Sequence, residues 1–357
     1  MRFALIGCGR IARNHMIAAH NNKLDLVALC DLDPLKMNTL LEASAFAGTA
    51  PSFYTDHTVM LREVKPQLVA IATDSGVHAR IALDCIRAGC HVIIEKPIAM
   101  SIDDARQIAA EAEKYHVKVA ACHQNRFNEA CQQMHLAREQ GRFGKLSHGS
   151  IHVRWNRNQN YYDQASWRGK WASDGGALMN QCIHGIDLLQ WMVGSNPVSV
   201  YGVTRQQYHP YLEAEDIGMA VVTFANGVIA TIEGTVNVYP QNLEETLYLF
   251  GETGTVKLGG KATNNIDVWQ FADRNEKDEG LEGKQEVIGN VYGNGHSRLY
   301  ADMLEAIRDD RDPLISVQEG TKALELILAI YKSQLTGQVV QLPLDNFAST
   351  DMTGYFD

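Results

Sequence analysis

Hydrophobic and polar positions follow one pattern up to about residue 122 and a different pattern after it. In the first part, short and nearly all-apolar runs alternate with longer segments in which apolar residues recur at helical spacing. The runs predict strands at 3–6, 26–30, 68–72, 91–94 and 117–121, and the longer segments predict helices at 11–20, 34–45, 77–88 and 102–115. Such an alternation is typical of a parallel sheet that helices cover on both faces.

Beyond residue 122 the strand-like segments are longer and alternate between apolar and polar residues. They predict strands at 198–207, 218–224, 228–236, 246–250, 254–258 and 266–271, with helices at 128–140, within 175–193, at 298–308 and at 318–335. Ala225-Asn226-Gly227 predicts a tight hairpin, because Asn-Gly tolerates a positive φ. We therefore expect an α/β domain at residues 1–122 and an α+β domain at residues 123–357, the latter with a large, mostly antiparallel, open-faced sheet.

The turn after the first predicted strand has the composition of a dinucleotide-binding turn and reads Gly7-Cys8-Gly9-Arg10-Ile11-Ala12. Gly7 permits the tight turn, Gly9 lets the backbone approach a pyrophosphate, and Ala12 lets helix and strand pack closely. Asp31 ends the second strand at the spacing of an acid that binds the ribose hydroxyls. These residues predict a Rossmann domain that binds NAD, since the carboxylate disfavours the 2′-phosphate of NADP; the alternative is a glycine turn that binds nothing.

The strand predicted at 91–94 ends in Glu95-Lys96-Pro97. Ligands of doubly wound sheets bind beyond the carboxyl ends of the strands, so Lys96 would lie beside the nicotinamide with a group that handles protons. Pro97 disfavours a helical conformation of Lys96 and keeps its backbone extended. The alternative is a surface lysine before a turn proline.

A second block of polar residues lies within 174–187. On a helix, Asn180 and His184 are four residues apart and Asp187 follows three residues later, so the three side chains share a face. Histidine has a suitable pKa for moving a hydroxyl proton, and Asp187 would fix its tautomer. The alternative is a core histidine with satisfied hydrogen bonds. No second histidine or cysteine stands at zinc-ligand spacing, so we expect no metal site.

Charge and composition narrow the class of protein. The net charge of −10 argues against binding to nucleic acid or to anionic membranes. The seven scattered cysteines form no CxxC pair and fit reduced thiols in the cytoplasm. The chain starts directly with a strand and contains no apolar stretch of membrane-spanning length. We therefore expect a cytoplasmic protein that does not contact a membrane.

One segment of this acidic chain is basic. Residues 154–170 contain Arg154, Arg157, Arg168 and Lys170 against only Asp163, and four aromatic residues are interleaved. Guanidinium groups with aromatic rings suit a diphosphate, a uronate carboxylate and a sugar face. The alternatives are ion pairs with acidic neighbours or a second subunit, and Trp167 with Arg168 could instead contact the cofactor.

Together these motifs resemble the glucose–fructose oxidoreductase / inositol dehydrogenase / rhizopine catabolism family over essentially the whole chain. The resemblance rests on the glycine turn, Asp31, Glu95-Lys96-Pro97, Trp167-Arg168, and Gly175-Gly176 with His184 and Asp187. It implies that His184 is the general base, that Lys96 orients the hydroxyl and stabilises the alkoxide, and that hydride passes to the nicotinamide. Inositol-type members have an aspartate where this chain has Asn180, which makes a free inositol a less suitable substrate.

Finer motifs are similar to one branch, the bacterial UDP-N-acetylglucosaminuronate 3-dehydrogenases of O-antigen synthesis. They lie at 123–128, 161–171, 179–184 and 351–356. The resemblance implies oxidation of the 3-hydroxyl of a UDP-N-acetylhexosamine or its uronate to a ketone. It also implies, as in some members, recycling of bound NADH by 2-oxoglutarate.

The motifs and the resemblance together lead to a set of expected contacts. We expect catalysis by Lys96, His184 and Asn180. We expect NAD to contact Gly7, Gly9, Arg10, Ile11, Asp31, Thr73, His78, Glu95, Lys96, Gln124, Trp167 and Arg168. We expect the substrate to contact Arg154, Arg157, Tyr162, Lys170, Asn180, Gln181 and His184.

Two other functions fit the same motifs. One is an NAD-dependent dehydrogenase of a free sugar or polyol, for which the basic segment would matter little. The other is a non-catalytic NAD-sensing regulator on the same scaffold, against which the intact Lys96 and His184 speak. A sheet covered on one side only would leave an apolar face exposed, and relatives pack that face on another subunit, so we expect a homodimer or homotetramer.

Overall fold

The chain forms two structural units in the computed structural model, which describes residues 1–273, 276–286 and 294–356. The first unit contains Met1–His123 together with His296–Thr321, and the second contains Gln124–Gly295 together with Lys322–Asp357. The pattern along the chain places a boundary near the end of the first stretch. It contains no signal for the return of 296–321 to the first unit.

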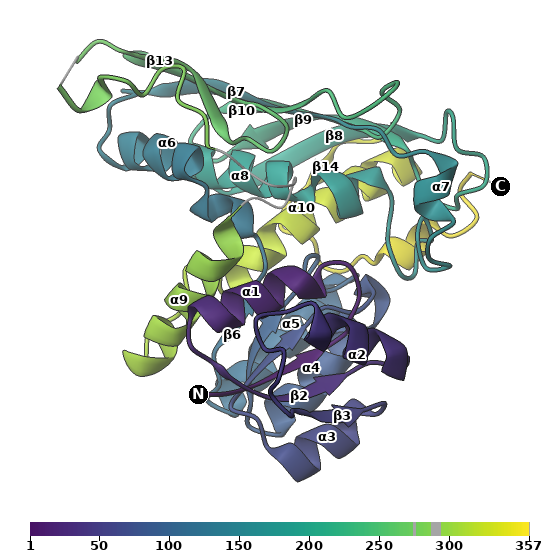
Figure 1. The fold of residues 1–357 in the computed structure, drawn as a ribbon. Helices are drawn as coiled ribbons and strands as arrows, with labels where there is room; N and C mark the ends of the chain where they lie inside the picture. The colour runs from purple at the N-terminus through teal and green to yellow at the C-terminus, as the bar shows by residue number, and fades with distance from the viewer. Residues whose placement is uncertain (274–275, 287–293, 357) are drawn as a thin grey trace. The chain divides into compact units, whose positions relative to one another are not determined.

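The first unit is built on a parallel sheet of six strands in the order β3-β2-β1-β4-β5-β6 (Figure 1). The strands are β1 (Arg2–Ile6), β2 (Asp25–Cys30), β3 (Ser52–Tyr54), β4 (Leu68–Ile71), β5 (His91–Ile94) and β6 (Val119–Ala121). The chain order reverses between β1 and β4, and ligands of such sheets bind at this switch point. The expected Rossmann-type parallel sheet is confirmed, and only the three-residue β3 lacked a strand signal.

Helices α1 to α5 connect these strands, and α9 joins the unit from later in the chain. They are α1 (Ala12–Asn21), α2 (Pro34–Glu42), α3 (His57–Val64), α4 (His78–Arg87), α5 (Ile102–Lys114) and α9 (Gly295–Arg308), with the short turn η1 (Ser75–Val77). The side chains of Asp33, Asp56 and Ser101 accept backbone N–H groups at the starts of α2, α3 and α5. These contacts satisfy N–H groups that have no partner inside the helix.

The second unit is built on an eight-stranded sheet in the order β13-β12-β11-β7-β10-β9-β8-β14. The strands are β7 (Leu146–Arg154), β8 (Pro197–Arg205), β9 (Ile217–Phe224), β10 (Ile229–Thr235), β11 (Glu244–Gly251), β12 (Gly254–Gly259), β13 (Asn265–Phe271) and β14 (Val340–Gln341). Every neighbouring pair is antiparallel except β7 and β10, which run parallel. The expected mostly antiparallel sheet is confirmed, although its central strand β7 carried no strand signal.

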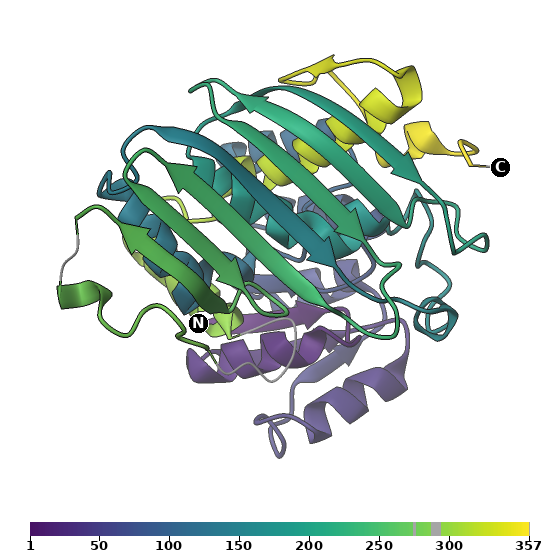
Figure 2. The same cartoon turned by 90° about the horizontal axis from the view of Figure 1, so that it is seen from above.

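Helices cover one face of this sheet (Figure 1). They are α6 (Glu129–Glu139), α8 (Ile183–Val193) and α10 (Val317–Thr336). The connections contain shorter helices, which are η2 (Gln124–Phe127), α7 (Gln159–Tyr162), the π-helical η3 (Leu178–Cys182), η4 (Glu276–Asp278) and η5 (Ser349–Met352). Residues along β9 alternate between buried and exposed, as in a strand with one covered face. Figure 2 shows the opposite face of the sheet, on which no helix of the described part of the chain lies. Met219, Val221 and Ile229 are exposed there, so the sheet is covered on one side as the sequence predicts.

Candidate active site

The glycine turn between β1 and α1 leaves room for a ligand. A Cβ on Gly7, whose φ is +93°, would lie 2.5 Å from the carbonyl atoms of Ala72, so only glycine fits the tight turn. A Cβ on Gly9 would meet no atom within 4 Å, and Gly9 itself is exposed. The start of α1 therefore offers open backbone N–H groups, as a dinucleotide pyrophosphate requires.

Asp31 fixes this turn against the end of β2. Its Oδ2 accepts the backbone N–H of Cys8 at 2.7 Å, and its Oδ1 accepts the backbone N–H of Asp33 at 2.9 Å. The side chain is half-buried and each carboxylate oxygen has a second lone pair. Asp31 can therefore hold the turn and still accept hydrogen bonds from ribose hydroxyls.

His78 joins the loop after β4 to the Glu-Lys-Pro turn. Its Nδ1 lies 2.8 Å from the carbonyl oxygen of Pro97, and its Nε2 lies 3.3 Å from the carbonyl oxygen of Thr73. The ring is buried, and burial lowers its pKa. Because the neutral ring donates from one nitrogen only, the shorter contact to Pro97 is the hydrogen bond. His78 thus positions the backbone around the expected nicotinamide site.

Lys96 is half-buried at the carboxyl end of β5, where the sequence places it. Its backbone N–H donates to Oε2 of the preceding Glu95 at 3.1 Å. The Glu95 side chain is buried, and its other oxygen faces His15. Within the first unit, Glu95 therefore points into the protein while Lys96 lies at the strand end, and the expected contact of the Glu95 side chain with NAD receives no support from this arrangement.

His184 lies in the first turn of α8 and is buried. The amide nitrogen of Gln124 lies 3.3 Å from its Nε2, and an amide N–H donates, so in this arrangement Nε2 is the accepting, basic nitrogen. Both oxygens of Asp187 accept from Arg126, at 2.7 and 2.8 Å. We expected Asp187 to fix the tautomer of His184, but its carboxylate pairs with the guanidinium of Arg126. We expected Gln124 to contact NAD, and its side chain faces His184.

Asn180 belongs to η3, the π-helical segment that precedes α8. Its amide nitrogen donates to Asp174 Oδ1, and Asp174 Oδ2 accepts the backbone N–H of Gly169 at 2.6 Å. A π turn contains an extra residue, so the simple four-residue helical spacing to His184 does not apply. Such segments are frequent at functional sites in proteins.

A buried carboxyl group that the sequence analysis missed supports η3. Glu215 Oε1 accepts the backbone N–H of Leu178 and the hydroxyl of Tyr331, both at 2.9 Å. Burial raises the pKa of Glu215 to about 8. A Cβ on Gly176 would lie 1.4 Å from Glu215 Oε2, so the carboxyl group occupies the space that a side chain would need. Gly175-Gly176 was the signal in the sequence for this close approach.

The cationic residues of the basic segment divide into two kinds. Arg154 donates two hydrogen bonds to Glu233, at 2.7 and 2.6 Å, and one to Glu244 at 2.6 Å. The charge of Arg154 is thus neutralised within the sheet, as predicted by the alternative in which the basic residues pair with acidic neighbours. Lys170 is exposed, and Tyr162 is buried with its pKa raised by burial. The prediction that these three residues contact substrate receives no support from these contacts.

Arg157 and Arg168 are the second kind, since neither forms an ion pair with a carboxylate in the part of the chain that the structure describes. Both guanidinium carbons lie over the ring of Tyr161, at 5.1 and 3.9 Å from its centroid, and Arg168 also lies 4.9 Å from that of Trp167. Arg157 Nε donates to Gln181 Oε1 at 2.9 Å. We call Arg157, Tyr161, Arg168 and Gln181 the arginine–tyrosine cluster, and it carries two cationic groups without an anionic partner.

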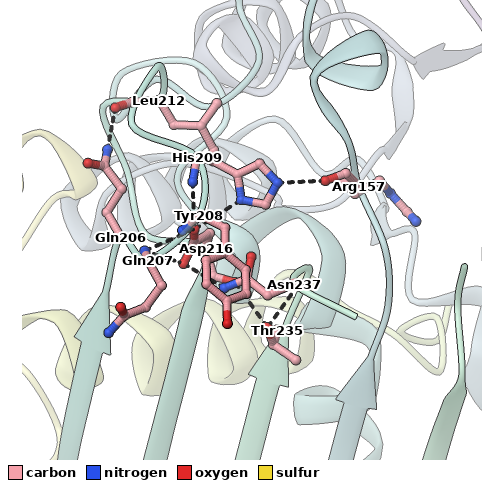
Figure 3. Close-up of polar contacts among 9 residues, drawn as sticks. All are labelled: Arg157, Gln206, Gln207, Tyr208, His209, Leu212, Asp216, Thr235 and Asn237. Atoms are coloured by element: carbon pink, nitrogen blue, oxygen red, sulfur yellow. Dashed lines mark hydrogen bonds and ion pairs between the residues drawn. The ribbon is translucent and has the colours of Figure 1, made fainter. Parts of the chain in front are cut away.

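A second buried network anchors this cluster (Figure 3). Asp216 Oδ2 accepts from His209 Nδ1 at 2.9 Å, and it also accepts the backbone N–H groups of Tyr208 and His209. His209 Nε2 lies 2.7 Å from the carbonyl oxygen of Arg157. No sequence motif indicated this pair of side chains. The contact of His209 with the carbonyl oxygen of Arg157 ties the backbone of Arg157 to the buried pair.

Comparison with known proteins agrees with a nicotinamide-dependent oxidoreductase. The model of an oxidoreductase family NAD-binding Rossmann fold matches residues 1–123, and the model of that family's C-terminal alpha/beta domain matches residues 139–342. The chain therefore belongs to the glucose–fructose oxidoreductase / inositol dehydrogenase / MocA family. Its cofactor is NAD, and the open turn at Gly9 beside Asp31 fits this cofactor.

Several relatives cover nearly the whole chain. The WlbA dehydrogenase from Bordetella pertussis, solved in complex with NADH and UDP-GlcNAcA, is 37% identical with a TM-score of 0.87 and covers 96% of this chain and 99% of its own. The WlbA dehydrogenase from Chromobacterium violaceum, in a complex with the same ligands, is 35% identical with a TM-score of 0.87 over 97% and 96%. A D-glucoside 3-dehydrogenase from Escherichia coli is 26% identical over 96% of this chain and 97% of its own.

Across residues 1–273, 276–286 and 294–356, no helix has both the length and the apolar character of a membrane span.

Proposed function

We propose that this protein oxidises the 3-hydroxyl of a UDP-N-acetylhexosamine, most suitably its uronate, to a 3-keto sugar. The observation that carries the proposal is the arginine–tyrosine cluster, in which Arg157 and Arg168 pair with no carboxylate among residues 1–273, 276–286 and 294–356. Two unmatched guanidinium groups favour an anionic ligand, and a UDP-uronate offers a diphosphate and a carboxylate. The two WlbA structures, which contain UDP-GlcNAcA, support the same substrate class.

Each predicted catalytic residue has a distinct task in this reaction. His184 Nε2, the accepting nitrogen, would take the hydroxyl proton, and Lys96 would orient the hydroxyl and stabilise the alkoxide as the proton leaves. Asn180, held by Asp174, would hydrogen-bond the sugar at the position where inositol-type members of the family have an aspartate. When bound, NAD accepts the hydride.

The cellular setting follows from the substrate class. A 3-keto nucleotide sugar is a substrate for an aminotransferase, so the product would enter bacterial surface polysaccharide synthesis, in the cytoplasm. We further propose that bound NADH is recycled by 2-oxoglutarate. The exposed apolar residues of the open sheet face, such as Met219 and Val221, support a homodimer or homotetramer.

A second candidate is a dehydrogenase of a free sugar or glycoside. The relative from Escherichia coli favours it, because a D-glucoside 3-dehydrogenase matches over nearly the full length. In that case the two guanidinium groups of the arginine–tyrosine cluster would not contact the substrate. The two candidates therefore differ in what removal of Arg157 does.

The test is turnover of UDP-N-acetylglucosaminuronate with NAD, followed by mass spectrometry for the loss of two hydrogens, with and without 2-oxoglutarate. We expect Arg157→Ala to raise KM for the uronate about 10- to 100-fold, since a charge-assisted contact contributes about 1.5–3 kcal/mol. Arg154→Ala is the matched control, because Arg154 already pairs with Glu233 and Glu244. Equal effects of the two variants, or turnover of glucosides alone, would contradict the proposal.

A further inference from the structure

A buried carboxylate stands directly before the predicted catalytic lysine. Glu95 is 5% exposed, and its Oε2 accepts the backbone N–H of Lys96 at 3.1 Å. The contact ties the peptide group that carries Lys96 to the side chain of its neighbour. The direction in which the lysine leaves β5 therefore depends on where the Glu95 carboxylate is held.

Two histidines from other elements of the first unit hold the second oxygen of this carboxylate. His15 Nε2, on α1, lies 3.1 Å from Glu95 Oε1, and His296 Nε2, on α9, lies 3.5 Å from the same oxygen. Burial would raise the pKa of Glu95, but the hydrogen bond from His15 and the nearby ring of His296 outweigh it and hold the pKa well below the ordinary value. The carboxylate is ionised, and the hydrogen bond from His15 fixes its position.

The orientation of His15 is itself fixed. A carboxylate only accepts hydrogen bonds, so His15 Nε2 donates to Glu95, and the other ring nitrogen, Nδ1, lies 2.8 Å from the hydroxyl of Tyr300. Tyr300 is fully buried, and its ring packs edge-on against Phe3 of β1. A continuous chain of hydrogen bonds thus runs from Tyr300 through His15 and Glu95 to Lys96.

We propose that Glu95, held by His15, is a positioning residue for Lys96. The inference rests on the proposed function in that Lys96 acts on the sugar hydroxyl. His15 belongs to the helix that starts after the glycine turn, so the chain of hydrogen bonds fixes the lysine in the same frame as the dinucleotide site. A buried ionised group costs more than an apolar side chain of similar volume, which favours a role in geometry over one in stability. A displacement of about 1 Å at a reacting group costs about 100-fold in rate.

The residues around Glu95 could also bind a metal ion, and the test has to distinguish this possibility from direct hydrogen bonding. His15, Glu95, Cys122 and His296 each place one donor atom within 4.8 Å of the others, a set that zinc accepts. We favour direct hydrogen bonding, because His15 already uses both ring nitrogens, one toward Tyr300 and one toward Glu95. Sequence spacing predicted no metal here, since the four residues come from distant parts of the chain.

The experiment compares Glu95→Ala and Glu95→Gln in the full-length protein. The amide can keep both contacts if the hydrogens of His15 and Tyr300 reverse, so Gln should largely rescue what Ala removes. We expect Glu95→Ala to lower kcat about 10- to 100-fold with KM for substrate and the Kd for NAD nearly unchanged. A larger primary isotope effect with the sugar deuterated at the reacting carbon should accompany the loss. Asp84→Asn is the matched control, because Asp84 pairs with His57 at 2.9 Å elsewhere in the same unit and should leave kcat unchanged.

The crystal structure of Glu95→Ala provides a readout that needs no substrate. We expect the Lys96 backbone to move relative to α1; an unmoved Lys96, or an unchanged kcat in Glu95→Ala, would overturn the proposal. Stoichiometric zinc in the purified protein, lost in Cys122→Ser, would also overturn it in favour of a metal centre. If the wild-type protein turns over glucosides and no UDP-sugar, the proposed substrate fails, and the same kcat comparison on the glucoside still decides the role of Glu95.

Discussion

Glu95 of the first unit and Glu215 of the second unit are both buried next to segments that carry predicted catalytic residues. Their pKa values are nevertheless shifted in opposite directions. Glu95 receives a hydrogen bond from His15 and lies 3.5 Å from His296 Nε2, and these two histidines hold its pKa well below the ordinary value against the effect of burial. Glu215 receives one backbone N–H and one tyrosine hydroxyl, and burial raises its pKa to about 8. The donors around a buried carboxyl group, and not its depth, therefore decide whether it is charged.

The difference corresponds to two ways of supporting a catalytic segment. Lys96 is held by an ionised group whose partners come from α1 and α9. The η3 segment with Asn180 is held by a carboxyl group that is mostly protonated at neutral pH and that fills the space above Gly176. Removing the Glu95 carboxylate should change the direction in which Lys96 leaves β5. Crowding the Glu215 carboxyl group should disturb the packing around η3.

The largest effect should come from crowding Glu215. Gly176→Ala would place a Cβ 1.4 Å from Glu215 Oε2, and no flexible side-chain end can absorb this overlap because Glu215 is fixed by Leu178 and Tyr331. We expect a loss of about 3 kcal/mol or more in the free energy of unfolding, measured by denaturant or heat. Gly9→Ala is the control, since its Cβ meets no atom within 4 Å. Equal stability of the two variants would show that the Glu215 carboxyl group does not fill this space.

Opposite pH dependences should separate the two glutamates. Glu215 has a raised pKa when folded, so its contribution to the free energy of unfolding is complete below its ordinary value of 4.5 and is lost as pH rises toward 8. Glu95 has a lowered pKa, so its contribution is present above 4.5 and is lost as pH falls below that value. Relative to the wild type, Glu215→Gln should therefore gain stability from pH 5 to 8, at about 1.4 kcal/mol per pH unit.

For Glu95→Gln, the free energy of unfolding relative to the wild type should change with pH in the opposite direction, and the change should occur at acid pH. The variant should be most destabilised, relative to the wild type, near neutral pH and less so as pH falls through the acid range. Thermal unfolding of the three proteins across pH 3–8 measures both trends. Parallel curves for the two variants would mean that the two carboxyl groups titrate alike.

The smallest effect should come from the tyrosine hydroxyls that end the two networks. Tyr331→Phe removes one donor from Glu215, and Tyr300→Phe removes the partner of His15 Nδ1. Each should cost about 1 kcal/mol in the free energy of unfolding. Only Tyr300→Phe should also lower kcat, since its network leads to Lys96. A loss of kcat in Tyr331→Phe of the same size would remove the distinction between the two supports.

Local motifs made the first unit predictable. The glycine turn, Asp31 and the end of β5 occur within runs whose pattern already specifies strand and helix, and the chemistry lies at strand ends. The same holds for the hairpin at Asn226-Gly227, which joins β9 to β10. These features depend on residues close together in sequence, so one chain is enough to recognise them.

Features that depend on distant partners were not predictable. The central strand β7 carried no strand signal, and it contains a glycine, Gly149, which disfavours strands in sequence patterns. A Cβ at Gly149 would lie 3.0 Å from the carbonyl oxygen of Tyr248 and 3.3 Å from Leu189, so distant parts of the chain explain the glycine. The ion pairs of Arg154 bring together residues 79 and 90 positions apart. Nor does a helical pattern distinguish a π turn from an α turn, so the position of Asn180 relative to His184 was not specified.

The parallel pairing of β7 with β10 bears on how the second unit folds. The strands β8, β9 and β10 form one meander and β11, β12 and β13 form another, and β7 lies between β10 and β11 as the strand that joins them. Each meander consists of local hairpins. By contrast, β7 pairs with strands that are synthesised much later, because Ser150 lies opposite Thr231 and Tyr248, which follow it by 81 and 98 residues. Because long-range pairing slows folding, insertion of β7 is the step at which we expect the sheet to form or to misassemble.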